Sequence, residues 1–188
     1  MRGLFPALNG AMAAGWFKRF AREAAGIAAV EFALIFPLML TFYFGAIEIT
    51  NMLTANRRVT SVAYTAADIT AQAASVSNAD ITDIFNASSA ILAPFSTTPI
   101  TVRITSVVAN SSNVPKVAWS DGHNIAPRAA GSNMTLPAGL TTAGSSVIVA
   151  EVTYAYASPI SELITETITF SDIAYLKPRR AVQVTRTN

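Results

Sequence analysis

Glu31 is the residue whose position most clearly implies chemistry, because it is an acid inside an apolar run. The run covers residues 24–47 and is otherwise interrupted only by Thr41 and small residues. An acid at the centre of a membrane helix costs roughly 2.5–3.5 kcal/mol, so it usually has a partner. The run itself contains no basic residue. Glu31 therefore lies at the membrane interface in a tilted or displaced helix, or its partner comes from processing or from another subunit.

Few other residues could do chemistry. His123 is the sole histidine and has only Asp121 nearby as a second metal ligand, so we expect a solvated loop. Asp80 and Asp83 are better explained by helix capping than by acid catalysis. The absence of cysteine excludes disulfides and thiolate metal sites. No nucleophile, base and orienting group can be assembled, and the net charge of +2 is too small for nucleic-acid binding. We expect no enzyme and no cofactor.

The apolar run is long enough to cross a bilayer, which needs roughly 20 residues. The segment before it carries four basic residues, Arg2, Lys18, Arg19 and Arg22. This charge predicts a cytoplasmic start and an exported remainder. A cleaved secretory signal fits less well, because its apolar region spans roughly 7–15 residues and Leu53-Thr54-Ala55 is a poor cleavage site. An uncleaved signal anchor remains open.

The string Gly26-Ile27-Ala28-Ala29-Val30-Glu31-Phe32 resembles a type IV prepilin cleavage motif. Over residues 18–57 the chain resembles the TadE/TadG-like family, with a basic leader, small residues, Val-Glu-Phe-Ala and a proline, here Pro37, near mid-membrane. Phe32 stands where the major Tad pilins typically have tyrosine, which favours a minor member. The motif departs from the Gly-Phe-Thr-Leu-Ile-Glu pattern of type II secretion pseudopilins.

The resemblance implies cleavage after Gly26 by a membrane-embedded prepilin peptidase. Ile27 would then be the first residue and Glu31 the fifth. Cleavage frees an α-amino group with a reference pKa near 8. This ammonium could pair with Glu31 of the same or a neighbouring subunit, which would offset part of the cost of burying the acid. Phe32 completes the recognition motif, and Pro37 is expected to kink the helix because it removes a backbone hydrogen bond.

Apolar spacing of three and four residues continues beyond the membrane run, which predicts one long helix from about residue 26 to 75. Two helices broken near Asn51 or Asn56 are the alternative. The apolar stripe predicted for the outer half of the long helix consists of Val59, Val62, Ala63, Ala66, Ile69, Ala73 and Val76. A second helix is predicted to start at Asp80 and to end at Pro94.

Alternating apolar residues predict strands at residues 100–105, 116–120 and 148–156, and a fourth between 165 and 175. Residues 121–146 are rich in Gly, Ala, Ser, Thr and Pro and predict a long exposed loop. The expected fold is α+β, a long helix packed on a small antiparallel sheet. Its expected segments are a leader (1–26), a transmembrane helix (27–47), an amphipathic extension (48–78) and an exported head (79–188).

These observations favour a minor pilin-like, TadE-like subunit for the assembly of a Tad-type adhesive pilus. Its expected partners are the inner membrane, the prepilin peptidase, other Tad pilins and the Tad inner-membrane platform. The head would be periplasmic, and both incorporation into the filament and a role as an assembly factor stay open. The alternative is an uncleaved single-pass envelope protein with a periplasmic binding or scaffolding head.

Overall fold

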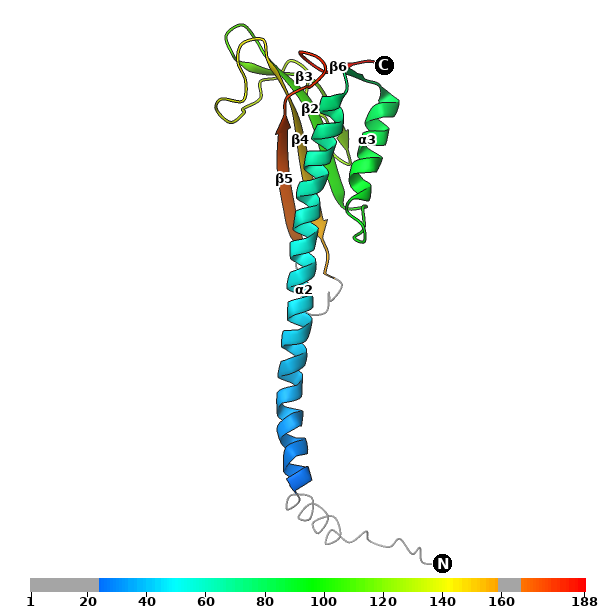
Figure 1. Cartoon of the computed structure of the whole chain (residues 1–188), viewed down its shortest axis with the longest axis vertical. Coiled ribbons are helices and arrows are strands. Elements are labelled where there is room, and N and C mark those ends of the chain that lie inside the picture. The colour runs from blue at the N-terminus through cyan, green and yellow to red at the C-terminus, as the bar shows by residue number, and fades with distance from the viewer. Residues whose placement is uncertain (1–23, 159–166) are drawn as a thin grey trace, which may run out of the picture. The chain divides into compact units, whose positions relative to one another are not determined.

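The computed structural model describes residues 24–158 and 167–188 and contains two compact units (Figure 1). The first unit ends at Ile47 and the second begins at Glu48. Residues 1–23, which hold the four basic residues of the predicted leader, lie outside the described residues. So do residues 165 and 166, at the start of the interval predicted to hold the fourth strand.

Helix α2 (Ala24–Gln72) contributes to both units. It continues through Asn51 and Asn56, so the prediction of one long helix is confirmed and the alternative of two helices is wrong. Pro37 lies inside the helix, and the Thr41 hydroxyl donates a hydrogen bond to the Pro37 carbonyl at 2.9 Å. The kink at Pro37 stays a prediction.

The start of helix α3 (Asn78–Ala90) is fixed by hydrogen bonds between Ser77 and Asp80. Ser77, rather than Asp80, is the capping residue, which corrects the predicted start. The Ser77 hydroxyl accepts from the Asp80 backbone N–H, and the Asp80 carboxylate accepts from the Ser77 backbone N–H at 2.8 Å. This reciprocal capping box satisfies two donors that the helix leaves unpaired. The helix ends at Ala90, before Pro94.

The second unit contains an antiparallel four-stranded sheet in the order β3-β2-β4-β5. Its strands are β2 (Ile100–Ala109), β3 (Pro115–His123), β4 (Ser146–Tyr156) and β5 (Ile168–Leu176). All four predicted strands are present, with β2, β3 and β4 longer than predicted. In register, Val102 faces Val152, which in turn faces Asp172. The α+β prediction is confirmed.

One face of the sheet forms the main core with α2 and α3 (Figure 1). Strand β2 contributes three alternating, fully buried residues to this core, Ile100, Val102 and Ile104. The buried stripe of α2 within the second unit consists of Ala55, Val59, Val62, Ala63, Ala66, Ala67 and Ala71. Short side chains let the helix backbone lie close to the sheet, and their removal from water stabilises this packing. Ile69 was predicted in this stripe but is 37% exposed.

The opposite face of the sheet is partly covered by the segment predicted to be an exposed loop. Val107, Val147 and Val149 are fully buried there, and Met134, Leu136, Leu140 and Tyr175 pack against them. The segment also pairs with β3, since the Met134 N–H donates to the Pro115 carbonyl at 3.1 Å. The predicted boundaries are wrong at both ends, because Asp121 to His123 belong to β3 and Ser146 begins β4.

A small second sheet closes the end of the second unit (Figure 1). The strand β1 (Ser75–Val76) follows α2 and pairs in parallel with β6 (Thr185–Arg186). The guanidinium of Arg186 then donates to Asp121 of β3 at 2.9 Å and to the side chain of Asn78. Nearby, the Trp119 indole N–H donates to the Val184 carbonyl at 2.7 Å. The segment around β6 therefore ties α2, α3 and the main sheet together.

Candidate assembly site

Gly26, Ile27, Glu31 and Phe32 all lie in the first three turns of α2. Ile27 and Glu31 are four residues apart, which places them on one face of the helix, roughly 6 Å apart along its axis. The Glu31 side chain is exposed and makes no hydrogen bond or ion pair with another described residue. Phe32 packs on Phe36 of the same helix, with ring centroids 5.2 Å apart. The helix thus presents a free carboxylate one turn from Ile27.

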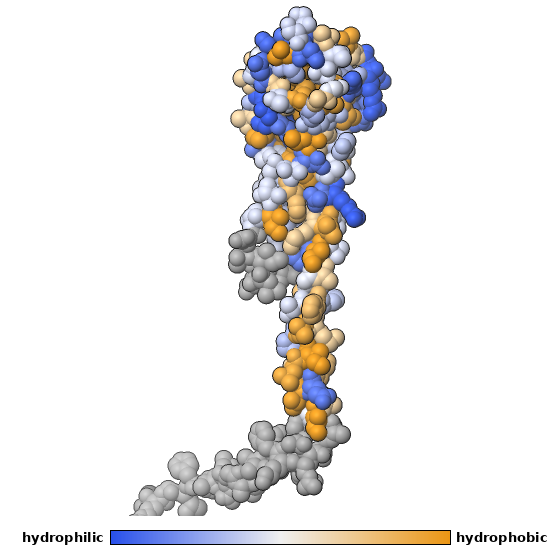
Figure 2. All heavy atoms as spheres, turned by 90° about the vertical axis from the view of Figure 1, so that its left-hand side faces the viewer, coloured by the Kyte–Doolittle hydropathy of each residue, from blue (hydrophilic) through white to orange (hydrophobic). Residues whose placement is uncertain are grey.

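The rest of this unit carries exposed apolar side chains, which are coloured orange in Figure 2. Leu34 is 75% exposed and Phe42 is 70% exposed. Other exposed members between residues 27 and 47 are Ile27, Val30, Phe32, Ile35, Phe36, Leu38, Met39, Leu40, Tyr43, Phe44 and Ile47. Such a continuous patch far exceeds what a water-soluble surface normally carries. Within the described residues one helix, spanning Gly26–Gln72, is long and apolar enough to cross a membrane.

Glu48 is a buried acid whose environment the sequence did not predict. It follows the apolar run directly, yet it is only 2% exposed. The Tyr156 hydroxyl donates to Glu48 Oε1 at 3.0 Å, while Oε2 has no hydrogen-bond partner. Burial, followed by the hydrogen bond and charge of Glu48, raises the pKa of Tyr156 to about 12. The pair joins α2 to the end of β4 across 108 residues of sequence, which no local pattern could reveal.

A second charged cluster lies on the other face of the sheet. Glu151 accepts from Arg103 at 2.7 Å and from Arg128 at 2.7 Å. Burial acts to raise the pKa of Glu151, but the hydrogen bonds and charges of both arginines outweigh it, so the pKa is lowered. Arg128 belongs to the segment between β3 and β4, and the cluster therefore fastens that segment to the sheet. We assign it a structural role.

The residues that might have suggested an enzyme or a metal site have structural surroundings. His123 ends β3 and its ring lies 5.6 Å from that of Phe85, so the predicted solvated loop is wrong. Hydrogen bonds from Ser77 lower the pKa of Asp80, as expected for a capping carboxylate. Within residues 24–158 and 167–188, no three histidine, cysteine or acidic residues are grouped to hold a metal ion.

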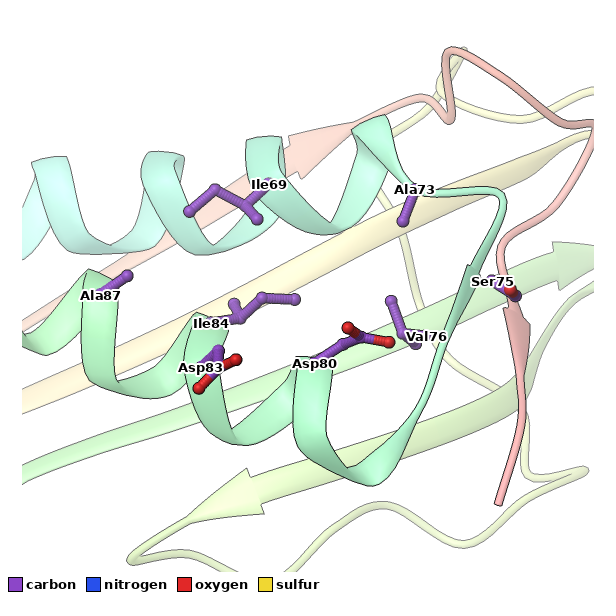
Figure 3. Close-up of a pocket in the computed structure, with 8 residues that line it drawn as sticks. All are labelled: Ile69, Ala73, Ser75, Val76, Asp80, Asp83, Ile84 and Ala87. Carbon is purple, nitrogen blue, oxygen red and sulfur yellow. The ribbon is translucent and has the colours of Figure 1, made fainter.

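The second unit also contains a groove of about 300 Å³ (Figure 3). Ile69 of α2 and Ala73, just after the helix, line one side, and Asp83, Ile84 and Ala87 of α3 line the other. Ser75, Val76 and Asp80 complete the lining. We call this the α2–α3 groove. Its surface is mainly apolar, with two carboxylates from α3, and nothing in its lining suggests catalysis.

Comparison with known proteins identifies the N-terminal part of the chain. Residues 26–68 match the model of a family described as TadE-like protein. No curated protein and no solved structure matched the chain. The match begins at Gly26, includes Glu31, Phe32 and Pro37, and ends within α2. That family is structural rather than catalytic. The resemblance seen in residues 18–57 is therefore confirmed by this match, and residues 26–68 are similar to TadE-like proteins.

Proposed function

We propose that this protein is a minor pilin-like subunit for the assembly of a Tad-type adhesive pilus, matured by a prepilin peptidase. The observation that carries the proposal is the free carboxylate of Glu31 in a belt of exposed apolar side chains, inside the family-matched segment. A lone acid in such a belt is costly unless a cation joins it. The match to a structural family and the long apolar helix support a membrane-anchored, pilin-like role.

Cleavage after Gly26 would supply that cation. It would leave Ile27 as the first residue with a free ammonium, one helical turn from Glu31. The same ammonium could reach Glu31 of a neighbouring subunit as the helices come together in the membrane. In either arrangement the pair offsets the desolvation of the carboxylate. Gly26 and Ile27 are the proposed processing site, Glu31 and Phe32 act in recognition and assembly, and Pro37 kinks the helix.

The membrane arrangement follows from the same proposal. Residues 1–26 form a cytoplasmic leader, and residues 27–47 span the inner membrane. The rest of α2 extends the helix as far as Gln72, short of the predicted residue 78, and the chain after it completes a periplasmic head. The partners are the prepilin peptidase, other Tad pilins and the inner-membrane platform. The exposed apolar belt supports this arrangement, because lipid or neighbouring apolar helices remove such a surface from water.

The mature N-terminus tests the proposal directly. Protein is purified from membranes of cells with an active prepilin peptidase, and its intact mass and N-terminal peptide are measured. We expect a chain beginning at Ile27. A Gly26→Val variant should remain uncleaved, because the peptidase requires close approach at this position. Gly45→Val is the matched control, since a Cβ at Gly45 meets no atom within 4 Å.

A chain that still carries its leader in those cells would overturn the proposal. It would instead favour an uncleaved single-pass envelope protein. In that case Glu31 would have no ammonium partner from Ile27, and the second unit would serve as a binding or scaffolding head.

A further inference from the structure

Two surface features of the second unit have no part in the proposed function. One is the α2–α3 groove. The other is the segment of residues 177–183 between β5 and β6, which we call the basic loop. Each feature combines charged side chains with exposed apolar surface, and the charges of the two features are opposite in sign.

The α2–α3 groove keeps apolar surface in contact with water. Ile69 is 37% exposed, although Ala66 and Ala67 just before it in α2 are fully buried. The two carboxylates of the groove also differ. Asp80 is held in the capping box with Ser77, whereas the exposed Asp83 makes no hydrogen bond or ion pair with a described residue. Asp83 is therefore an uncompensated negative charge beside an open apolar groove.

The basic loop combines exposed apolar surface with positive charge. Val182 is 78% exposed, the highest value among the exposed large hydrophobic residues of the described part of the chain. Lys177 and Arg180 are exposed and form no ion pair with the described residues. Arg179 fixes the loop on α2, because its side chain pairs with Asp68 and its backbone N–H donates to the Ala71 carbonyl at 2.9 Å. The loop thus presents an exposed apolar side chain together with two free cations.

The two features lie on different flanks of α2. The basic loop is attached at Asp68 and Ala71, whereas Ile69 and Ala73 line the α2–α3 groove. Asp68 and Ile69 are successive residues of α2, so their side chains point in directions about 100° apart around the helix. A surface on one flank is well placed to meet the complementary surface on the other flank of a second molecule.

We propose that the basic loop of one copy docks in the α2–α3 groove of a second copy. Val182 enters the apolar part of the groove, and Arg180 and Lys177 face Asp83. Opposite charges at the rim set the orientation, while burial of Val182 and Ile69 supplies the favourable apolar contact. The contact is heterologous, so one copy of a docked pair keeps a free groove and the other keeps a free loop, and the arrangement can repeat along a row.

Cysteine crosslinking tests the contact, because the chain has no cysteine of its own. Full-length Ala87→Cys and Val182→Cys chains carrying different tags are produced together, without other pilus components, and their membranes are oxidised. We expect a mixed dimer that joins the two tags. A chain with both substitutions should form a ladder of crosslinked species. Each single variant produced alone should give at least about tenfold less dimer, because a heterologous contact does not bring like positions together.

Charge reversal separates this contact from random collisions in the membrane. Asp83→Lys in the Ala87→Cys chain, or Arg180→Glu in the Val182→Cys chain, should reduce the mixed dimer at least about tenfold. Combining both reversals should restore it. Both side chains are exposed, and protease resistance of the second unit checks that each variant folds. Failure to form the mixed dimer, or equal yield in the reversed variants, would overturn the proposal. Adding Glu31→Ala should leave the crosslink unchanged, which separates this contact from the proposed role of Glu31.

Discussion

The two units of this protein use the same kinds of apolar side chain in opposite ways. Val30 in the first unit is 56% exposed, whereas Val59 and Val62 in the second unit are fully buried, although all three belong to α2. In the second unit the apolar stripe of α2 is covered by the protein's own sheet. In the first unit no described residue covers it. The apolar surface of the first unit therefore needs lipid or another helix to remove it from water, whereas that of the second unit is already buried.

The largest expected difference between the two units is their response to the same substitution, a valine replaced by aspartate. Val62→Asp would bury an unpaired carboxylate in the core and should destabilise the second unit by about 3–5 kcal/mol. Val30→Asp should leave that unit folded and instead weaken membrane insertion, by about 2.5–3.5 kcal/mol at most. Limited proteolysis measures the first effect and alkaline extraction of membranes the second. Equal protease resistance of the two variants would contradict the assignment of the core.

The opposite change, removal of the acid Glu31 from the first unit, tests the same difference between the units. We expect Glu31→Ala to insert and to be cleaved normally, since it removes a cost of up to about 2.5–3.5 kcal/mol from insertion. Assembly should be impaired because the ammonium of Ile27 loses its partner. Pilus formation measured by electron microscopy checks this. Thr41→Ala is the matched control, as its hydroxyl only bonds the Pro37 carbonyl within α2. Normal piliation of the Glu31→Ala strain would end this role for Glu31.

The buried pair of Glu48 and Tyr156 allows a smaller test in the second unit. Tyr156→Phe removes the hydrogen bond and leaves both oxygens of a buried carboxylate unsatisfied, so we expect a loss of about 1–3 kcal/mol. Tyr154→Phe is the matched control, because its hydroxyl makes no hydrogen bond with a described residue. Glu48→Gln should cost less than Tyr156→Phe, since an amide oxygen still accepts the bond. Thermal denaturation in detergent ranks the three variants, and equal melting temperatures for the two tyrosine variants would contradict this account.

The smallest expected effects are those of pH on the second unit. The folded protein raises the pKa of Tyr156 to about 12, so the stabilisation is complete below its ordinary value of 10.0 and is lost as the pH rises towards 12. The lowered pKa of Glu151 acts in the other direction. Its contribution is complete above its ordinary value of 4.5 and is lost as the pH falls below it. Melting temperatures of Tyr156→Phe and Glu151→Gln across pH should show flatter alkaline and acid limbs, respectively. Unchanged limbs would rule out these groups as the cause.

The sequence was informative wherever a local pattern determines structure. Alternation in residues 148–156 is enough to predict β4, and helical spacing predicts α2 beyond the membrane run. It was less informative where distant groups decide the outcome. The cap of α3 lies at Ser77 because Asp80 is used as its reciprocal partner, which shifts the start by three residues. The burial of Glu48 depends on Tyr156, and the covering of Val149 depends on Met134 and Leu136.

The two surface sites of the protein also differ in whether a local pattern in the sequence could predict them. The spacing of Gly26, Ile27, Glu31 and Phe32 could be recognised directly because the motif is continuous and helical. The α2–α3 groove could not be predicted, since it forms only where α2 and α3 come together and Ile69 is left outside the core. Periodicity alone assigned Ile69 to the buried stripe, because its spacing fits a helix face whose far side is unknown from sequence.

The pairing of β1 with β6 has a consequence for the order of events during biogenesis. Ser75, three residues after the end of α2, finds its strand partner only at Thr185, after every other strand of the described structure. The apolar stripe of residues 55–71 is covered by the main sheet, whose last strand ends at Leu176. A chain that crosses a membrane with α2 leading must therefore hold this stripe unprotected until most of the later sequence has emerged. Closure by β6 is the step that completes the unit, and before it the emerging chain is a natural client for a holding chaperone.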